Sequence, residues 1–154
     1  MCIRDSFIVS LTEENSISAK SYLKQENISL IKGNTREVLK ACDYAIVSSG
    51  TATLEAMLSK TPFCVIYKSN PISNFLITNI LLQLDYISLP NILANKKIVP
   101  ELRQDDLKIN KVIEELDYLI DNSNEAMIQE FKALHQSLIN ENDNKFSKII
   151  DKLS

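Results

Sequence analysis

The 154-residue sequence has very little glycine, no long apolar run and no excess of basic residues. With only 2 glycines, Gly33 and Gly50 are each expected in a turn that needs a residue without a Cβ. The absence of any apolar run of about 18 residues excludes a membrane-spanning helix. The 17 Lys and Arg against 20 Asp and Glu argue against nucleic acid as a partner.

Cysteine and histidine are also scarce. The 3 cysteines are odd in number and lack metal-ligand spacing, which suits a reducing cytoplasm. We interpret Cys42 and Cys64 as small core residues. The only histidine, His135, falls on a stretch with helical apolar periodicity and is interpreted as structural. The length and the 45% hydrophobic residues predict one domain with a sizeable core.

Strand and helix patterns alternate through the first half of the chain. This order predicts an α/β fold with a doubly wound parallel sheet covered by helices, whose ligands bind beyond the carboxyl ends of the strands. Thr35 is the expected N-cap of its helix. The expected strands are Phe7–Leu11, Ile28–Ile31, Asp43–Ser48 and Pro62–Tyr67, and the expected helices are Ser16–Gln25, Thr35–Ala41 and Thr51–Ser59.

The second half has a different character. Ile72–Leu84 is predicted to be a helix that is apolar on most of its circumference, and it could pack in the core, form a dimer surface or face acyl chains. Asp85–Ala94 is interpreted as irregular, with Leu89 extended before its proline. Three further helices are expected at Asn110–Asp121, Asn124–Leu138 and Asn142–Leu153.

The most informative stretch is Asp43–Glu55, which predicts a strand, a turn containing Gly50 and the start of a helix. A helix start presents unpaired backbone N–H groups, and its dipole favours negative charge. Gly50 would let a phosphate approach the backbone without a clash. We therefore predict a nucleotide diphosphate at this turn. The alternative is an ordinary strand-to-helix turn with a capping hydroxyl.

Residues 1–6, Met-Cys-Ile-Arg-Asp-Ser, match the translation of a common sequencing-library transposon end. No secretory apolar region follows them, so they are not a signal peptide. We expect these six residues to be non-native and the chain to be a fragment.

Six segments of the chain, in order, are Ser49–Glu55, Pro62, Tyr67–Lys68, Asp85–Ala94, Val99–Gln104 and Phe131–Gln136. Together they resemble the lipid-A-disaccharide synthase family, which has the two-domain GT-B design. The likeness implies that residues 7–154 form the Rossmann-like UDP-sugar-binding domain with a C-terminal helical segment, and that the N-terminal acceptor domain is absent.

The resemblance implies a hexosyltransferase that moves 2,3-diacylglucosamine from UDP to 2,3-diacylglucosamine 1-phosphate, forming the lipid A disaccharide precursor. It implies no metal and no cofactor, because the turn and helix start supply the electrostatics for departing UDP. The expected setting is the cytoplasm of a Gram-negative bacterium, at the inner membrane surface, with a homodimer as a further expectation. The family's proposed catalytic carboxylate lies in the absent half, so no catalytic residue is assigned and the fragment alone is expected to be inactive.

The implied UDP-sugar site is a short set of residues. Its members are Ser49, Gly50, Thr51, Ala52, Thr53, Glu55, Asn91 and Gln104.

Two of these residues have competing interpretations. Glu55 would accept hydrogen bonds from both ribose hydroxyls, or else complement the dipole in the first helical turn. Asn91 would lie beside the nucleotide sugar, or else cap a helix beginning at Ile92. We expect the Glu55 carboxylate to open to a cleft beside Gly50 and Asn91.

Glu101, Lys68 and Arg103 are weaker candidates. The two basic residues could neutralise phosphate, although exposed basic residues are usually only solvated.

Two other functions stay open. One is the donor domain of another UDP-N-acetylglucosamine-type GT-B enzyme, such as the peptidoglycan glucosaminyltransferase or a UDP-sugar epimerase. The other is a non-catalytic UDP-binding or dimerisation module.

Overall fold

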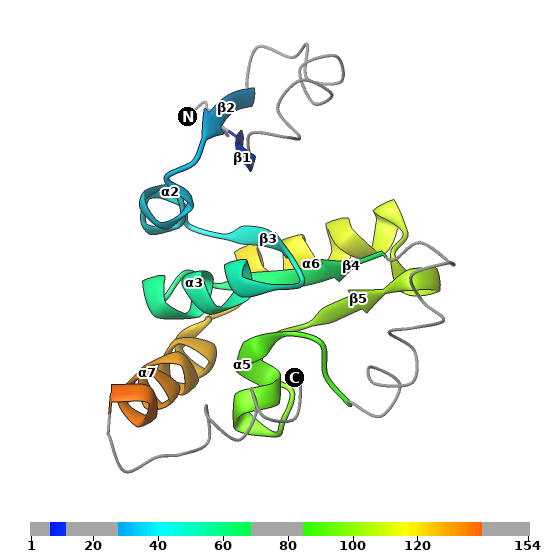
Figure 1. Cartoon of the computed structure of the whole chain (residues 1–154). Helices are drawn as coiled ribbons and strands as arrows, with labels where there is room; N and C mark the ends of the chain where they lie inside the picture. Colours follow the sequence, from blue (N-terminus) through cyan, green and yellow to red (C-terminus); the bar gives the residue numbers. More distant parts are fainter. Residues whose placement is uncertain (1–6, 12–27, 69–84, 140–154) are drawn as a thin grey trace, which may run out of the picture.

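Parallel strands form the centre of the molecule (Figure 1). The computed structural model describes residues 7–11, 28–68 and 85–139. Within these ranges the strands belong to two parallel sheets, β1–β2 and β3–β4–β5. The α/β class and the parallel pairing predicted from the sequence are confirmed. The strands are β1 (Phe7–Leu11), β2 (Ile28–Lys32), β3 (Ala45–Ser48), β4 (Phe63–Tyr67) and β5 (Glu101–Arg103).

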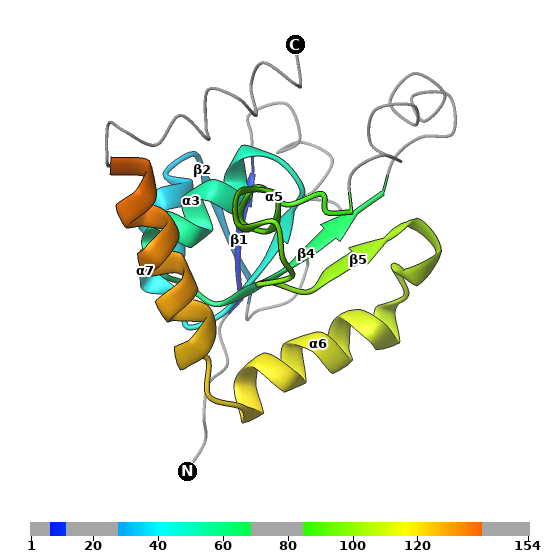
Figure 2. The ribbon, with the colours of Figure 1, turned by 90° about the horizontal axis from the view of Figure 1, so that it is seen from below.

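Helices cover both faces of the three-stranded sheet, as Figures 1 and 2 show. Helix α3 packs against α2, α5 and α7 on one face, whereas α6 packs against β4 from the other. None of the helices in the described ranges is long and apolar enough to cross a membrane. The helices are α2 (Thr35–Ala41), α3 (Thr51–Ser59), α5 (Leu89–Ala94), the 3-10 turn η2 (Gln104–Asp106), α6 (Ile109–Asp121) and α7 (Glu125–Ile139).

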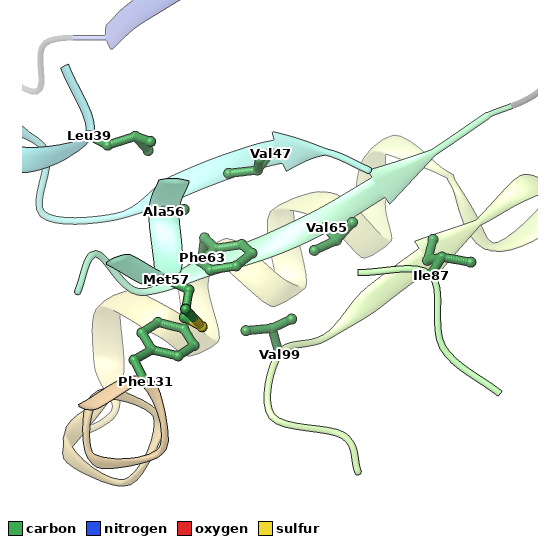
Figure 3. Close-up of a cluster of buried hydrophobic side chains, with 9 residues drawn as sticks. All are labelled: Leu39, Val47, Ala56, Met57, Phe63, Val65, Ile87, Val99 and Phe131. Carbon is green, nitrogen blue, oxygen red and sulfur yellow. The ribbon is translucent and has the colours of Figure 1, made fainter. Parts of the chain in front are cut away.

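The core follows from the alternation of side chains along β4. Phe63 contributes to the cluster beneath α3 and α7, and its ring stacks on that of Phe131 with centroids 5.6 Å apart. Figure 3 shows Phe131 pointing toward Met57 and Phe63. Full burial of side chains of this kind contributes about 1.5–3 kcal/mol each. Cys64, between Phe63 and Val65, is fully buried. Burial first, and the charge of Glu115 on α6 second, raise its pKa to about 11.

Most predicted elements are confirmed, but the prediction for Asp85–Ala94 is wrong in its second half. Residues 89–94 form α5, and Leu89 is the first helical residue rather than an extended one. Ser88, at the N-cap, takes the extended conformation (φ −90°, ψ 142°). Pro90 then falls in the first helical turn, where its missing N–H costs nothing.

The sequence also predicted turns at the two glycines and the N-cap of α2. Gly33 (φ 66°) and Gly50 (φ 139°) both occupy turns with positive φ, as expected. Thr35 was expected to cap α2, but this is wrong, because the N-cap is Asn34 in a left-handed conformation and Thr35 is already helical. The predicted helices at 16–25, 72–84 and 142–153, and the segment 1–6, lie outside the described residues.

Candidate functional site

The turn after β3 has the geometry that the sequence predicted. The N–H of Ser49 donates to the Ile66 carbonyl at 3.0 Å and extends the pairing with β4 by one residue. Gly50 is the N-cap of α3, and no side chain caps the helix there. The capping hydroxyl that this alternative expected is therefore not present at the N-cap. The first N–H groups of α3 point out of the helix without intrahelical acceptors.

Gly50 is exposed, and a Cβ built on it would meet nothing within 4 Å. Space for a ligand is thus open directly over the Cα atom. Its φ of 139° with ψ of −160° is a combination essentially confined to glycine. The exposed Thr51 and half-buried Ala52 follow and supply the first two helical N–H groups.

Two hydroxyl groups hold this turn in place. Ser49 Oγ donates to the Ile87 carbonyl at 2.9 Å. Thr53, which is fully buried, donates from Oγ1 to the Gly50 carbonyl at 2.7 Å and accepts from the Leu89 N–H at 3.2 Å. The hydroxyls of Ser49 and Thr53 therefore connect the turn to the segment leading into α5.

That segment is in turn held by the Glu101 carboxylate, whose side chain is only 6% exposed. The carboxylate accepts from the N–H groups of Ile87 (3.1 Å) and Ser88 (2.9 Å), and from Ser88 Oγ (2.7 Å). Arg103 adds an ion pair at 2.7 Å. Burial alone would raise the pKa of Glu101, but hydrogen bonds from Ser88, Arg103 and the backbone outweigh it and hold the pKa below its ordinary value.

Asn91, another predicted ligand contact, is 0% exposed. Its Nδ2 group donates to the Val99 carbonyl and to Glu101, each at 2.9 Å, and its Oδ1 accepts from the N–H groups of Ile98 (2.7 Å) and Val99 (2.9 Å). These four bonds use both donors and both acceptor sites of the amide. In this conformation the side chain has no hydrogen-bonding capacity left for a ligand. It is also not the N-cap, because α5 begins at Leu89.

Glu55 lies in the second turn of α3, since the first turn contains no acidic residue. The interpretation that it complements the dipole in the first turn is therefore wrong. Its side chain lines a hollow of about 520 Å³ between α2 and α3. The other described residues lining this hollow are Asn34, Thr35, Arg36, Glu37 and Leu58.

Thr51, which follows Gly50, and Glu55, which lines the hollow, are four residues apart and are neighbours on one face of α3. Thr53 points about 160° away from Glu55 around the helix, toward the Leu89 N–H at the start of α5. The hollow that Glu55 lines includes neither Gly50 nor the fully buried Asn91, so this hollow is not the cleft expected beside both residues.

The carboxyl ends of β4 and β5 lie at the same edge as Gly50, because the three strands are parallel and Tyr67 pairs with Arg103. Lys68, just beyond β4, is exposed. Arg103 is engaged by Glu101 and by the Asp85 carbonyl (2.5 Å). Gln104 follows with a left-handed backbone, φ 43°, an unusual conformation for this residue type and one often found at functional sites.

The remaining candidates lie away from this edge. His135 Nδ1 is 2.9 Å from Lys60 Nζ, which also donates to the Phe131 carbonyl at 3.3 Å and so joins α3 to α7. In the described ranges, no group of three or more His, Cys, Asp or Glu residues could hold a metal ion.

The comparison with known proteins decides the family. A family model described as lipid-A-disaccharide synthetase matches residues 6–150. The chain belongs to the lipid-A-disaccharide synthetase family. In this chain, the turn, the segment before α5 and the Val99–Gln104 segment that suggested the resemblance are joined in one hydrogen-bonded network.

Curated relatives named lipid-A-disaccharide synthase support this assignment. The Haemophilus influenzae (strain PittEE) protein is 42% identical over 118 residues, which cover 73% of this chain and 30% of the relative. The Francisella philomiragia protein is 35% identical over 135 residues, covering 86% of this chain and 36% of the relative. The Idiomarina loihiensis protein is 39% identical over 117 residues, which cover 76% of this chain and 31% of the relative. This member of the lipid-A-disaccharide synthetase family therefore spans about a third of the length of the relatives that it matches.

Sequence reasoning missed the central place of Glu101 and the role of Ser88. The only available signal was a carboxylate two residues before an arginine in a short apolar stretch, Val99–Arg103. Such a pattern does not reveal that the carboxylate oxygens of Glu101 accept hydrogen bonds from backbone N–H groups 13 and 14 residues earlier in the chain.

Proposed function

We propose that this chain carries the nucleotide-sugar site of a glycosyltransferase that moves 2,3-diacylglucosamine from UDP to 2,3-diacylglucosamine 1-phosphate. The supporting observation is the open helix start at Gly50, at the carboxyl end of a parallel strand in a lipid-A-disaccharide synthetase family member. The relatives' name fits the lipid A disaccharide precursor as product.

In this proposal the UDP pyrophosphate lies over Gly50 and accepts from the N–H groups of Thr51 and Ala52. Departing UDP gains negative charge, and N–H groups already aligned with the α3 dipole stabilise that charge most in the transition state. Gly50 leaves room for the phosphate. Ser49 and Thr53 act indirectly, by fixing the turn through the Ile87 carbonyl and the Leu89 N–H.

The ribose then enters the hollow between α2 and α3, where the Glu55 carboxylate accepts from its two hydroxyl groups. Gln104, at the carboxyl end of β5, is proposed to contact the sugar side of the donor. Asn91 is proposed as a positioning residue, because its amide is occupied by Glu101, Ile98 and Val99. No catalytic residue is assigned to this chain.

We also propose where the whole enzyme acts, how it assembles and what its binding site needs. The whole enzyme would act at the cytoplasmic face of the inner membrane, because both of its proposed sugar substrates carry acyl chains, and would form a homodimer. Neither a metal nor a cofactor is needed for the binding that we propose, since backbone N–H groups supply the positive potential at the phosphates.

Calorimetric titration with UDP tests the site. Gly50→Val forces a β-branched residue into a glycine-only conformation beside the phosphates, so UDP binding should be lost while circular dichroism at low temperature still shows a folded chain. Asn95→Val strains another positive-φ position, at an exposed residue away from the hollow and the Gly50 turn, and should keep UDP binding. Unchanged UDP affinity in Gly50→Val would remove the site from this turn. In the whole enzyme, Gly50→Val should abolish formation of the disaccharide.

A further inference from the structure

The turn that follows β3 is held on both sides of Gly50 by the segment that leads into α5. The Ile87 carbonyl accepts from Ser49 Oγ at 2.9 Å. The Leu89 N–H donates to Thr53 Oγ1 at 3.2 Å, and Thr53 Oγ1 donates in turn to the Gly50 carbonyl at 2.7 Å. The position of this segment therefore constrains the backbone of the turn.

Glu101 binds the same segment from β5, which lies on the other side of β4 from β3. Its carboxylate accepts from the Ile87 N–H at 3.1 Å, from the Ser88 N–H at 2.9 Å and from Ser88 Oγ at 2.7 Å. Ile87 thus donates its N–H to Glu101 and offers its carbonyl to Ser49. A displacement of this one residue would weaken both hydrogen bonds, and the turn would lose one of its two anchors.

The network around Glu101 requires a carboxylate. This side chain also accepts from the Asn91 amide at 2.9 Å and from Arg103 at 2.7 Å. An ionised carboxylate only accepts hydrogen bonds, whereas a glutamine amide has one acceptor oxygen and an NH₂ group that would face these donors. Because the Glu101 side chain is only 6% exposed, water would not readily replace the hydrogen bonds lost in such a substitution.

We propose that Glu101 is a positioning residue, which fixes the phosphate-binding turn through the segment leading into α5 and does not contact the nucleotide. This inference rests on the UDP site proposed above. The N–H groups of Thr51 and Ala52 can bind phosphate well only where the turn presents them correctly, and a misplacement of about 1 Å in a site can cost about a hundredfold in rate. Loss of the Glu101 carboxylate should therefore lower the affinity of the folded chain for UDP.

Calorimetric titration with UDP tests the effect on binding. Glu101→Gln should weaken UDP binding roughly tenfold, while circular dichroism at low temperature still shows a folded chain. Glu130→Gln is the matched control, because it removes the same charge from α7, where Glu130 pairs with the exposed Lys96. This control should bind UDP like the native chain. Unchanged UDP affinity in Glu101→Gln would overturn the proposal.

A double-mutant cycle tests the route from Glu101 to the turn. If Glu101 acts through Ile87 and Ser49, part of its effect is already lost in Ser49→Ala. The loss of UDP affinity in the double variant should then be at least about threefold smaller than the product of the two single losses. Losses that simply multiply would mean that Glu101 affects the nucleotide independently of this hydrogen bond, and the proposal would fail.

The second anchor provides a test that leaves Glu101 in place, and it applies even if Glu101→Gln does not fold. Thr53→Val removes the hydroxyl that joins Leu89 to Gly50 with little change in volume, and it should weaken UDP binding roughly tenfold. Thr53→Ser keeps the hydroxyl and should restore the affinity to within about threefold of the native value. Equal affinities of the two variants would show that the segment does not position the turn.

Amide hydrogen exchange without nucleotide separates this proposal from the UDP site itself. The N–H groups of Ser49 and Thr53 both donate to backbone carbonyls, so their exchange is slowed in the folded chain. In Glu101→Gln both should exchange at least about tenfold faster relative to Val112 on α6, and in Glu130→Gln at the native rate. Unchanged relative exchange at both amides would overturn the proposal whatever the UDP affinity. If the native chain fails to bind UDP, the proposed nucleotide site is wrong, and these two amides still decide whether Glu101 positions the turn.

Discussion

The Ser49 hydroxyl donates a hydrogen bond to the Ile87 carbonyl at 2.9 Å, across 38 residues of sequence. The Ile87 N–H is itself bound by Glu101, which lies on β5, the strand on the other side of β4 from β3. The position of the candidate phosphate-binding turn therefore depends on a carboxylate that would not contact the ligand. We therefore expect the hydrogen bonds from Ser49 to Ile87 and from Ile87 to Glu101 to affect both the free energy of unfolding and the affinity for a nucleotide.

Ser49→Ala tests the link. The substitution leaves the partly buried Ile87 carbonyl without its donor, which should lower the free energy of unfolding by about 1–2 kcal/mol. Urea denaturation measures this change, and UDP titration should show weaker binding. Ser48→Ala, at the exposed neighbouring position, should change stability by less than about 0.5 kcal/mol and serves as the control. Equal effects of the two variants would contradict the role given to Ser49.

Asn91→Asp should be strongly destabilising. It places a carboxylate where the Nδ2 group now donates to Glu101 at 2.9 Å, so two buried negative charges would meet. We expect a loss of about 3–5 kcal/mol at neutral pH. Repulsion raises the pKa of the pair in the folded state, so the folded variant binds more protons than the unfolded one and becomes more stable as the pH falls from neutrality toward 5.

The exposed Asn95 provides the matched control, because Asn95→Asp adds the same charge without a buried neighbour. Its left-handed conformation (φ 51°) is one that aspartate tolerates. Urea denaturation at several pH values should show recovery of stability on mild acidification only for Asn91→Asp. A loss below about 1 kcal/mol would mean that the local structure rearranges to separate the two carboxylates.

The pH dependence of stability should carry the signature of Glu101. Its pKa is lowered from the ordinary 4.5 in the folded state, so its charged form stabilises the fold. This contribution is complete above the unfolded value and is lost as the pH falls through the folded pKa. The difference in unfolding free energy between the native chain and Glu101→Gln should therefore be largest above pH about 5 and shrink in more acidic buffer. A difference independent of pH would rule out the ionised network.

The elements predicted correctly are those with local signals. The bounds of α2 and α3 follow from helix formers beside Gly33 and Gly50, and β4 follows from a short apolar run after Pro62. The strand β5 is only three residues long, and it forms by pairing with β4. No local sequence pattern predicts that pairing. The helix α5 is similar, because it begins where Glu101 binds the N–H of Ser88.

The same distinction applies to the site. The Gly50 turn was predictable because one residue type fits its backbone, whereas the separation of Glu55 from Asn91 depends on which side of α3 packs against α5. Sequence spacing gave no information on that packing. The hollow between α2 and α3 likewise arises from the approach of two helices.

The proposed role of Glu55 can be separated from a general effect of charge. A carboxylate that accepts from both ribose hydroxyls makes charge-assisted bonds, and their loss costs about 1.5–3 kcal/mol. Glu55→Gln should therefore weaken UDP binding about ten- to a hundredfold. 2′-Deoxy-UDP, which lacks one of the two hydroxyls, should bind weakly to the native chain and lose little more in the variant.

Glu37 supplies the control, because it lines the same hollow from α2. Glu37→Gln removes an equal charge without touching the ribose, so it should leave the discrimination between UDP and 2′-deoxy-UDP unchanged. Calorimetric titration of both nucleotides into both variants gives the four affinities that are needed. If Glu55→Gln weakens the two nucleotides equally, the carboxylate does not bind the ribose, and the hollow must take another part of the donor. If only UDP is weakened, and only by Glu55→Gln, the ribose lies between α2 and α3 with its phosphates over Gly50.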